Sequence, residues 1–216
     1  MSIPVAEIEK HVHIPSGSVS LGARLTLPGD AHSLVVFAHG SGSSQFSPRN
    51  NFVADVLAAH GFAVLVMDLL TTSEDLSHKN RFNIELLATR LTSARHWIGE
   101  EESLCDFAIG IFGVNTGAAA ALKAAARLGN DIGAIVSRGG RLDLDGEELV
   151  QVQAPTLLIA GGNDPATVEI NQRALEKLTC VKKLEIIPGA TYLFEEPGTL
   201  DQVAYLSNAW FKKYLY

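Results

Sequence analysis

The stretch that decides the fold is Ile111–Ala120, which reads IFGVNTGAAA. It begins with the end of an apolar run typical of a strand and finishes in alanines, which are strong helix formers. Glycines stand two residues before and two residues after Asn115. Glycine at those places permits tight packing around a turn, and asparagine tolerates a positive φ better than most residues. The stretch therefore predicts a strand that turns sharply into a helix, with Asn115 at the tip.

Apolar runs and helical patterns alternate on both sides of this turn. Runs typical of buried strands lie at 34–38, 63–67, 107–112, 132–136, 156–160 and 184–187. Helical spacing occurs at 51–60, 83–98, 116–127, 168–178 and 200–215. Alternating segments at 8–14 and 19–27, joined by Ser16-Gly17-Ser18, predict a hairpin of antiparallel edge strands. The expected fold class is α/β: one domain over 1–216 with a doubly wound, mostly parallel sheet flanked by helices.

Three more strand ends carry small or polar residues, and ligands of such sheets bind at the carboxyl ends of strands. The loop 38–44 (AHGSGSS) allows backbone N–H groups to turn toward a ligand oxygen, although a simple Gly/Ser turn has the same composition. Asp164 follows the strand at 156–160, where a carboxylate orients a histidine or caps a helix. Tyr192 follows the last strand.

Five phrases together resemble the dienelactone-hydrolase-like branch of the α/β-hydrolases. They are 38–44 (AHGSGSS), 47–50 (SPRN), 113–122 (GVNTGAAAAL), 137–141 (SRGGR) and 188–198 (PGATYLFEEPG). The resemblance implies the α/β-hydrolase fold and a Ser-His-Asp triad for carboxylic esters or lactones, with family motifs G-A-S-T-G and G-A-T-H-L-F-E-E-P-G. By this resemblance, Asn115 stands at the position of the nucleophile, Asp164 at that of the acid and Tyr192 at that of the histidine. The oxyanion-binding places fall on Gly40, Ser41 and Thr116.

Two of the three triad places therefore hold residues that cannot do the usual chemistry. The amide of Asn115 is not a nucleophile that a histidine activates, and a tyrosine, with an ordinary pKa of about 10, is a poor base near neutral pH. We expect weak or no hydrolase activity. Three explanations remain open: a ligand-binding pseudoenzyme, a hydrolase scaffold altered in the laboratory, or a protein that uses different residues for another reaction. Deamidation of Asn115 to an aspartate nucleophile carries low weight, because Tyr192 would still have to act as the base.

Other side chains offer limited replacement chemistry. His39 lies beside the oxyanion loop, and its side chain is expected either to brace that loop or to approach the pocket. The segment 68–80 is expected to shape or cover the same pocket. His78 in this segment is expected to be a solvated loop residue. Histidines expected away from the site are His11, His13, His32, His60 and His96. Serines that lack an oriented base are Ser41, Ser43 and Ser73.

The segment 137–141 offers charge at a further strand end. Arg138 or Arg141 there can hold a carboxylate or phosphate of a ligand by paired hydrogen bonds. An ion pair to Asp143 or Asp145 is the somewhat favoured alternative.

The composition of the chain limits the kinds of molecule that it is expected to bind. The chain has 216 residues, 47% of them hydrophobic, and a formal net charge of -7, without a concentration of Lys and Arg. We therefore expect a small-molecule ligand, an ester, lactone or acyl compound, and neither a nucleic acid nor a membrane. No leader or membrane-length apolar run is visible, which predicts a cytoplasmic protein. Cys105 and Cys180 are expected to be reduced, buried thiols, and no cofactor or metal is expected.

Overall fold

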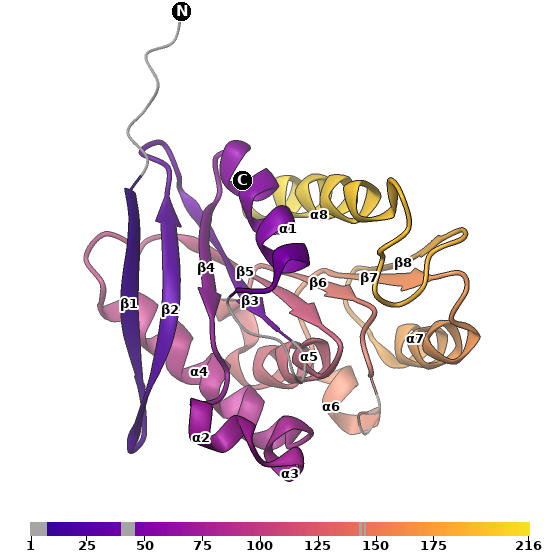
Figure 1. Cartoon of the computed structure of the whole chain (residues 1–216), viewed down its shortest axis with the longest axis horizontal. Coiled ribbons are helices and arrows are strands. Elements are labelled where there is room, and N and C mark those ends of the chain that lie inside the picture. Colours follow the sequence, from indigo (N-terminus) through magenta and orange to yellow (C-terminus); the bar gives the residue numbers. More distant parts are fainter. Residues whose placement is uncertain (1–7, 40–45, 143, 145) are drawn as a thin grey trace, which may run out of the picture.

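A computed structural model describes residues 8–39, 46–142, 144 and 146–216, and its strands form one eight-stranded sheet (Figure 1). The strands are β1 (Ile8–Ser16), β2 (Val19–Leu27), β3 (Ser33–Ala38), β4 (Ala63–Met67), β5 (Ala108–Val114), β6 (Ala134–Arg138), β7 (Thr156–Gly161) and β8 (Lys182–Ile187). Their order across the sheet is β1-β2-β4-β3-β5-β6-β7-β8. β1 and β2 pair antiparallel, as do β2 and β4, and all other pairs are parallel. The expected mostly parallel sheet is confirmed.

Helices cover both faces of the sheet (Figure 1). They are α1 (Pro48–Ala59), α2 (Thr72–Asp75), α3 (His78–Arg81), α4 (Ile84–Glu100), α5 (Thr116–Leu128), the 3-10 helix η1 (Gly129–Asp131), α6 (Gly146–Val150), α7 (Pro165–Lys177) and α8 (Thr199–Leu215). α1 and α8 pack on one face, and α4, α5, α6 and α7 pack on the other. In the described part of the chain, no helix has the length and apolarity needed to cross a membrane.

The alternation of side chains along the strands divides the core into two layers. In β3, Leu34 and Val36 belong to the cluster beneath α4 and α5, whereas Val35 and Phe37 belong to the cluster beneath α1 and α8. Successive strand residues point to opposite faces, so a continuously apolar strand fills both layers at once. This explains why the central strands read as unbroken apolar runs.

Two features differ from the sequence-based expectations. β2 is not an edge strand, because it pairs with β4 as well as with β1, and only β1 occupies that edge. The short helices α2, α3 and α6 were not predicted, because four or five residues give no measurable helical period. The hairpin turn is confirmed: Ser16 pairs with Val19, and Gly17 has the positive φ of 61° that the turn requires.

The turn from β5 into α5 is packed as its glycine spacing predicts. A Cβ at Gly113 would lie 2.5 Å from the Cα of Ala118, and a Cβ at Gly117 would lie 2.1 Å from the carbonyl oxygen of Ala38. Both neighbours are backbone atoms, which cannot move aside as a flexible side chain can. The end of β3 therefore lies directly against the first turn of α5.

We expect Gly117→Ala to lower the free energy of unfolding by roughly 1–3 kcal/mol, because the new methyl group must displace the β3 backbone. Urea unfolding followed by circular dichroism measures the change. Gly99→Ala in α4 is the matched control, since its Cβ meets only the end of the Arg95 side chain, at 3.0 Å. That change should stabilise the protein by up to about 1 kcal/mol, because alanine favours helix over glycine. Equal effects of the two substitutions would contradict the close-packing account.

Candidate functional site

Asn115 occupies the tip of the turn in a strained backbone conformation. Its φ of 53° and ψ of -118° lie in a sparsely populated region for a residue with a side chain, at a cost of about 1–3 kcal/mol. Its N–H donates to the carbonyl oxygen of Arg138 at 3.3 Å, and its own carbonyl oxygen accepts from the N–H groups of Ala118 and Arg141, each at 3.2 Å. The backbone is therefore held from β6 as well as from α5.

The side chain of Asn115 is less well satisfied than its backbone. Its Oδ1 is buried and has no hydrogen-bond partner among the described residues, and the side chain does not cap α5. Thr116 follows as the first, buried residue of the helix. Gly40 and Ser41, the other expected oxyanion-binding residues, lie outside the described residues, as does Ser43.

The loops that follow β7 and β8 lie against each other at the same edge of the sheet. The N–H of Asn163 donates to the carbonyl oxygen of Ala190, and its side-chain amide donates to that of Gly189, both at 2.8 Å. A Cβ at Gly161 would come within 2.5 Å of the Ala190 oxygen. Asp164 and Tyr192, the expected acid and histidine positions, thus lie on two loops that are joined by hydrogen bonds.

Asp164 serves as the N-cap of α7. Its Oδ1 accepts from the Thr167 N–H at 3.1 Å, and its Oδ2 accepts from the Thr167 hydroxyl at 2.6 Å. Tyr192 is 44% exposed, and its backbone lies against Gly139 after β6. In the described part of the chain, no hydrogen bond joins the side chains of Asn115, Asp164 and Tyr192. The fold brings these residues to neighbouring strand ends without assembling a hydrogen-bonded triad.

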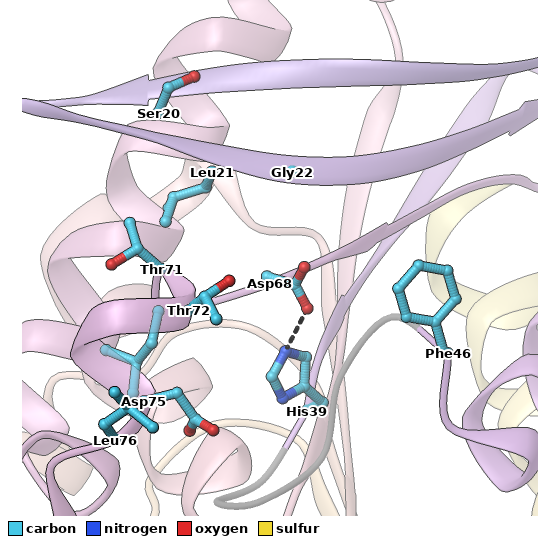
Figure 2. Close-up of a pocket in the computed structure, with 11 residues that line it drawn as sticks. Ser20, Leu21, Gly22, His39, Phe46, Asp68, Thr71, Thr72, Asp75 and Leu76 are labelled. Carbon is cyan, nitrogen blue, oxygen red and sulfur yellow. Dashed lines mark ion pairs between the residues drawn. The ribbon is translucent and has the colours of Figure 1, made fainter.

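A second polar pair lies at the ends of β3 and β4. His39 Nε2 is 3.3 Å from Asp68 Oδ1, and His39 is 8% exposed (Figure 2). Both line a cavity of about 510 Å³ whose other walls are Ser20, Leu21, Gly22, Phe46, Leu70, Thr71, Thr72, Asp75 and Leu76. His39 therefore faces a cavity, which is one of its two expected roles. Asp68 was missed by the sequence analysis, although it follows a buried strand directly and could have been found by the same signal as Asp164.

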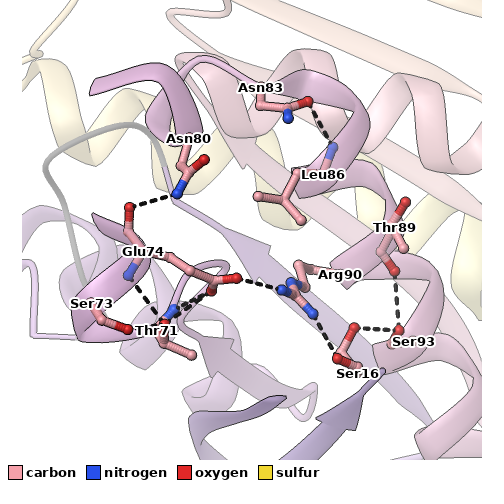
Figure 3. Close-up of polar contacts among 10 residues, drawn as sticks. All are labelled: Ser16, Thr71, Ser73, Glu74, Asn80, Asn83, Leu86, Thr89, Arg90 and Ser93. Atoms are coloured by element: carbon pink, nitrogen blue, oxygen red, sulfur yellow. Dashed lines mark hydrogen bonds and ion pairs between the residues drawn. The ribbon is translucent and has the colours of Figure 1, made fainter. Parts of the chain in front are cut away.

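The cavity wall between β4 and α4 is held by a polar network (Figure 3). Thr71 and Glu74 form a capping box at the start of α2, and Glu74 Oε1 accepts from Arg90 Nη2 at 2.7 Å. Arg90 Nη1 also donates to the carbonyl oxygen of Ser16, at 2.7 Å. This network ties the segment 71–75 to α4 and to the end of β1. The segment 68–80 contributes Asp68, Leu70, Thr71, Thr72, Asp75 and Leu76 to the wall of this cavity, while its expected role at the active-site pocket stays a prediction.

Glu74 is ionised by this network. Partial burial by itself raises the pKa of Glu74, but hydrogen bonds from the backbone and side chain of Thr71 and the charge of Arg90 outweigh burial and hold the pKa below its ordinary value of 4.5. Because the folded-state pKa is depressed, the resulting stabilisation is present above pH 4.5 and is lost as the pH falls through the lowered pKa.

The remaining candidates lie elsewhere or are paired. His78 begins α3 and stacks on Phe82, with ring centroids 4.6 Å apart. Ser73 Oγ lies 3.2 Å from the Thr71 hydroxyl. Cys105 is exposed, which corrects the expectation of a buried thiol, while burial raises the pKa of Cys180. The described residues contain no group of three or more His, Cys, Asp or Glu side chains suited to a metal ion.

We expect Glu74→Gln to lower the free energy of unfolding by about 1–2 kcal/mol at pH 7, because Arg90 loses its charged partner. The difference from the parent should shrink as the pH falls below 4.5. Urea unfolding over this pH range measures both effects. Glu169→Gln, which removes the exposed partner of Arg173, is the control and should change stability little at any pH. A loss that is the same at every pH would count against the ion-pair account.

Known proteins resemble this chain over nearly its whole length. Two Mycobacterium tuberculosis proteins, from strains CDC 1551 and H37Rv and each named "Putative phosphoribosyl transferase", are 48% identical to it over 207 residues. That match covers 96% of this chain and 47% of theirs, so the chain spans about half the length of these relatives.

Solved structures share the arrangement of strands and helices. The crystal structure of dienelactone hydrolase from Anabaena variabilis is 47% identical, with a TM-score of 0.94 over 97% of this chain and 99% of that one. Est1E from Butyrivibrio proteoclasticus shares the fold at 15% identity, with a TM-score of 0.81 over 94% of this chain and 98% of that one. The model of the dienelactone hydrolase family matches residues 21–210, a range that includes the strand ends at Asn115, Asp164 and Tyr192. The chain belongs to the dienelactone hydrolase family and has the α/β-hydrolase fold.

Proposed function

We propose that this protein binds a small ester, lactone or acyl compound and has little or no hydrolase activity of the serine-triad type. The observation that carries this proposal is Asn115 at the strained turn, where its amide stands at the place of a nucleophile. An amide cannot be activated by a base to attack a carbonyl carbon. Tyr192 at the histidine place is a phenol, whose ordinary pKa of about 10 makes it a poor base near neutral pH.

The names of the relatives differ in how strongly they support a proposal for the ligand of this chain. The Anabaena variabilis protein is described as a dienelactone hydrolase and matches this chain end to end, which supports a lactone or ester ligand. The Mycobacterium tuberculosis name describes a protein of which this chain covers 47%. More than half of that protein has no counterpart here, so its name gives no ground for proposing phosphoribosyl transfer by this chain.

Binding is tested by the thermal stability of the protein in the presence of esters, lactones and their acyl products. A ligand that binds only the folded protein raises its melting temperature, by an amount that grows with the ratio of ligand concentration to Kd. Stabilisation by at least one of these compounds supports the proposal. Absence of stabilisation across all three classes would count against retained binding.

A second candidate function rests on His39 and Asp68. A buried imidazole with its Nε2 3.3 Å from a carboxylate, facing a cavity of about 510 Å³, combines the groups that a general base requires, although Nε2 forms no hydrogen bond with a described residue. Such a pair could activate a water molecule without any nucleophile at position 115. Esterase activity of the parent that survives Asn115→Ala and is lost in both His39→Gln and Asp68→Asn would favour this candidate. Activity that is indifferent to both latter substitutions would exclude it.

We expect Asn115→Ser and Tyr192→His together to raise hydrolysis of p-nitrophenyl butyrate by about 10²–10⁴-fold, the usual contribution of a general base. Each single substitution should add little, since a serine without an imidazole has no base and an imidazole beside an amide has nothing to activate. Asp164 already follows β7, so no third substitution should be required. Initial rates of the parent, the singles and the double measure the effect.

The matched control is Asn115→Ala with Tyr192→Phe, which changes the same positions without adding reactive groups. It should be no more active than the parent. A parent as active as the Ser/His double would show that these positions are not the active site. A double that is folded but inactive would show that the frame around the turn no longer supports hydrolysis.

A further inference from the structure

Arg138, the last residue of β6, is a buried cation that forms no ion pair with any described residue. It is 3% exposed, and both its Nε and its Nη1 are sealed from solvent with no hydrogen bond to any described residue. Burial, and next the positive charge of Arg49, lower the pKa of Arg138 to about 10. The guanidinium therefore stays charged at neutral pH.

Arg90 shows how a buried arginine is satisfied elsewhere in this fold. It is 7% exposed, and it donates to the carbonyl oxygen of Ser16 and to the carboxylate of Glu74, each at 2.7 Å. Arg138 is more deeply buried and has neither kind of acceptor among the described residues. An uncompensated buried charge costs several kcal/mol, so proteins seldom keep one without a partner or a ligand.

The surroundings of Arg138 add positive charge to the site. Arg138 is two residues beyond Val136, so its side chain points to the same face of the sheet, the one covered by α1 and α8. Arg49 lies in the first turn of α1 and pairs with Glu195. No carboxylate of the described residues pairs with Arg138, and the charge that acts on it is the positive charge of Arg49. Arg49 Nε is likewise buried without a hydrogen-bond partner in the described structure.

The site lies close to the candidate active site. The carbonyl oxygen of Arg138 accepts from Asn115, and the next residue, Gly139, lies against the backbone of Tyr192. A guanidinium presents paired N–H groups that match the oxygens of a carboxylate or a phosphate.

We propose that Arg138, assisted by the charge of Arg49, binds an oxyanion group, a carboxylate or a phosphate, of a ligand held at the end of β6. The inference does not depend on whether hydrolysis is lost, because anion binding is measured without turnover. The ion pair to Asp143 or Asp145 that the sequence also allows is the competing account. Both of these aspartates lie outside the described residues.

The test compares the parent with Arg138→Met, which keeps the length of the side chain and removes its charge. Melting temperatures are measured in sodium chloride, sodium phosphate and sodium acetate at equal ionic strength, and anion affinity is measured by calorimetric titration. We expect phosphate or acetate to stabilise the parent saturably, and Arg138→Met to weaken that anion at least tenfold. In chloride alone, Arg138→Met should be no less stable than the parent. Arg138→Lys should bind more weakly than the parent and more tightly than Arg138→Met.

Arg173→Met is the control, because Arg173 is an exposed arginine paired only with Glu169 in the described structure. It should leave the anion response unchanged. The proposal is overturned if all three salts act alike on the parent. It is also overturned if Arg138→Met is strongly destabilised in chloride and the substitution of Asp143 and Asp145 by asparagine has the same effect, since Arg138 would then be paired within the chain. The relative response to phosphate and acetate identifies the anionic group.

Discussion

The carbonyl oxygen of Ala38 lies 2.1 Å from the place that a Cβ at position 117 would occupy, and the active-site edge of the sheet depends on this contact. Ala38 also pairs with Gly113 in the ladder between β3 and β5. The end of β3 therefore contacts both the strand side and the helix side of the turn that carries Asn115. Any wider spacing would separate the loop after β3 from the first turn of α5. Glycine at 113 and 117 is thus a requirement of backbone geometry, whatever chemistry position 115 performs.

The strained turn and its chemistry are separable for the same reason. The backbone of Asn115 is held by hydrogen bonds with Arg138, Ala118 and Arg141, none of which involves its side chain. The cost of the strain, about 1–3 kcal/mol, is offset by these contacts and by the packing of α5. A family member can therefore exchange its nucleophile for an amide and keep the frame. Membership of the family then establishes the fold, while activity must be argued from the residues at the site.

Features of the fold that depend on local sequence pattern could be predicted from the sequence. The continuous apolar runs of β3 and β4 and the spacing of Gly113 and Gly117 express contacts that every member of such a sheet must make. Contacts between residues far apart in the chain could not be predicted in this way. The link from Arg90 to Ser16 crosses 74 positions, and no local pattern specifies it. The pairing of His39 with Asp68 was missed because it depends on the lateral order of β3 and β4, which the sequence does not state.

Arg90 and Arg138 show why buried charge separates structural residues from functional ones in this protein. The charge of Arg90 is compensated inside the chain by Glu74 and by the carbonyl oxygen of Ser16. These hydrogen bonds hold the segment 71–75 beside the cavity. The charge of Arg138 has no such compensation among the described residues, and its burial opposes folding. A buried charge at a strand end needs a compensating interaction, and the proposed anion would supply it for Arg138. The asymmetry between these two arginines is the physical ground for the proposed anion site at the end of β6, next to the turn that carries Asn115.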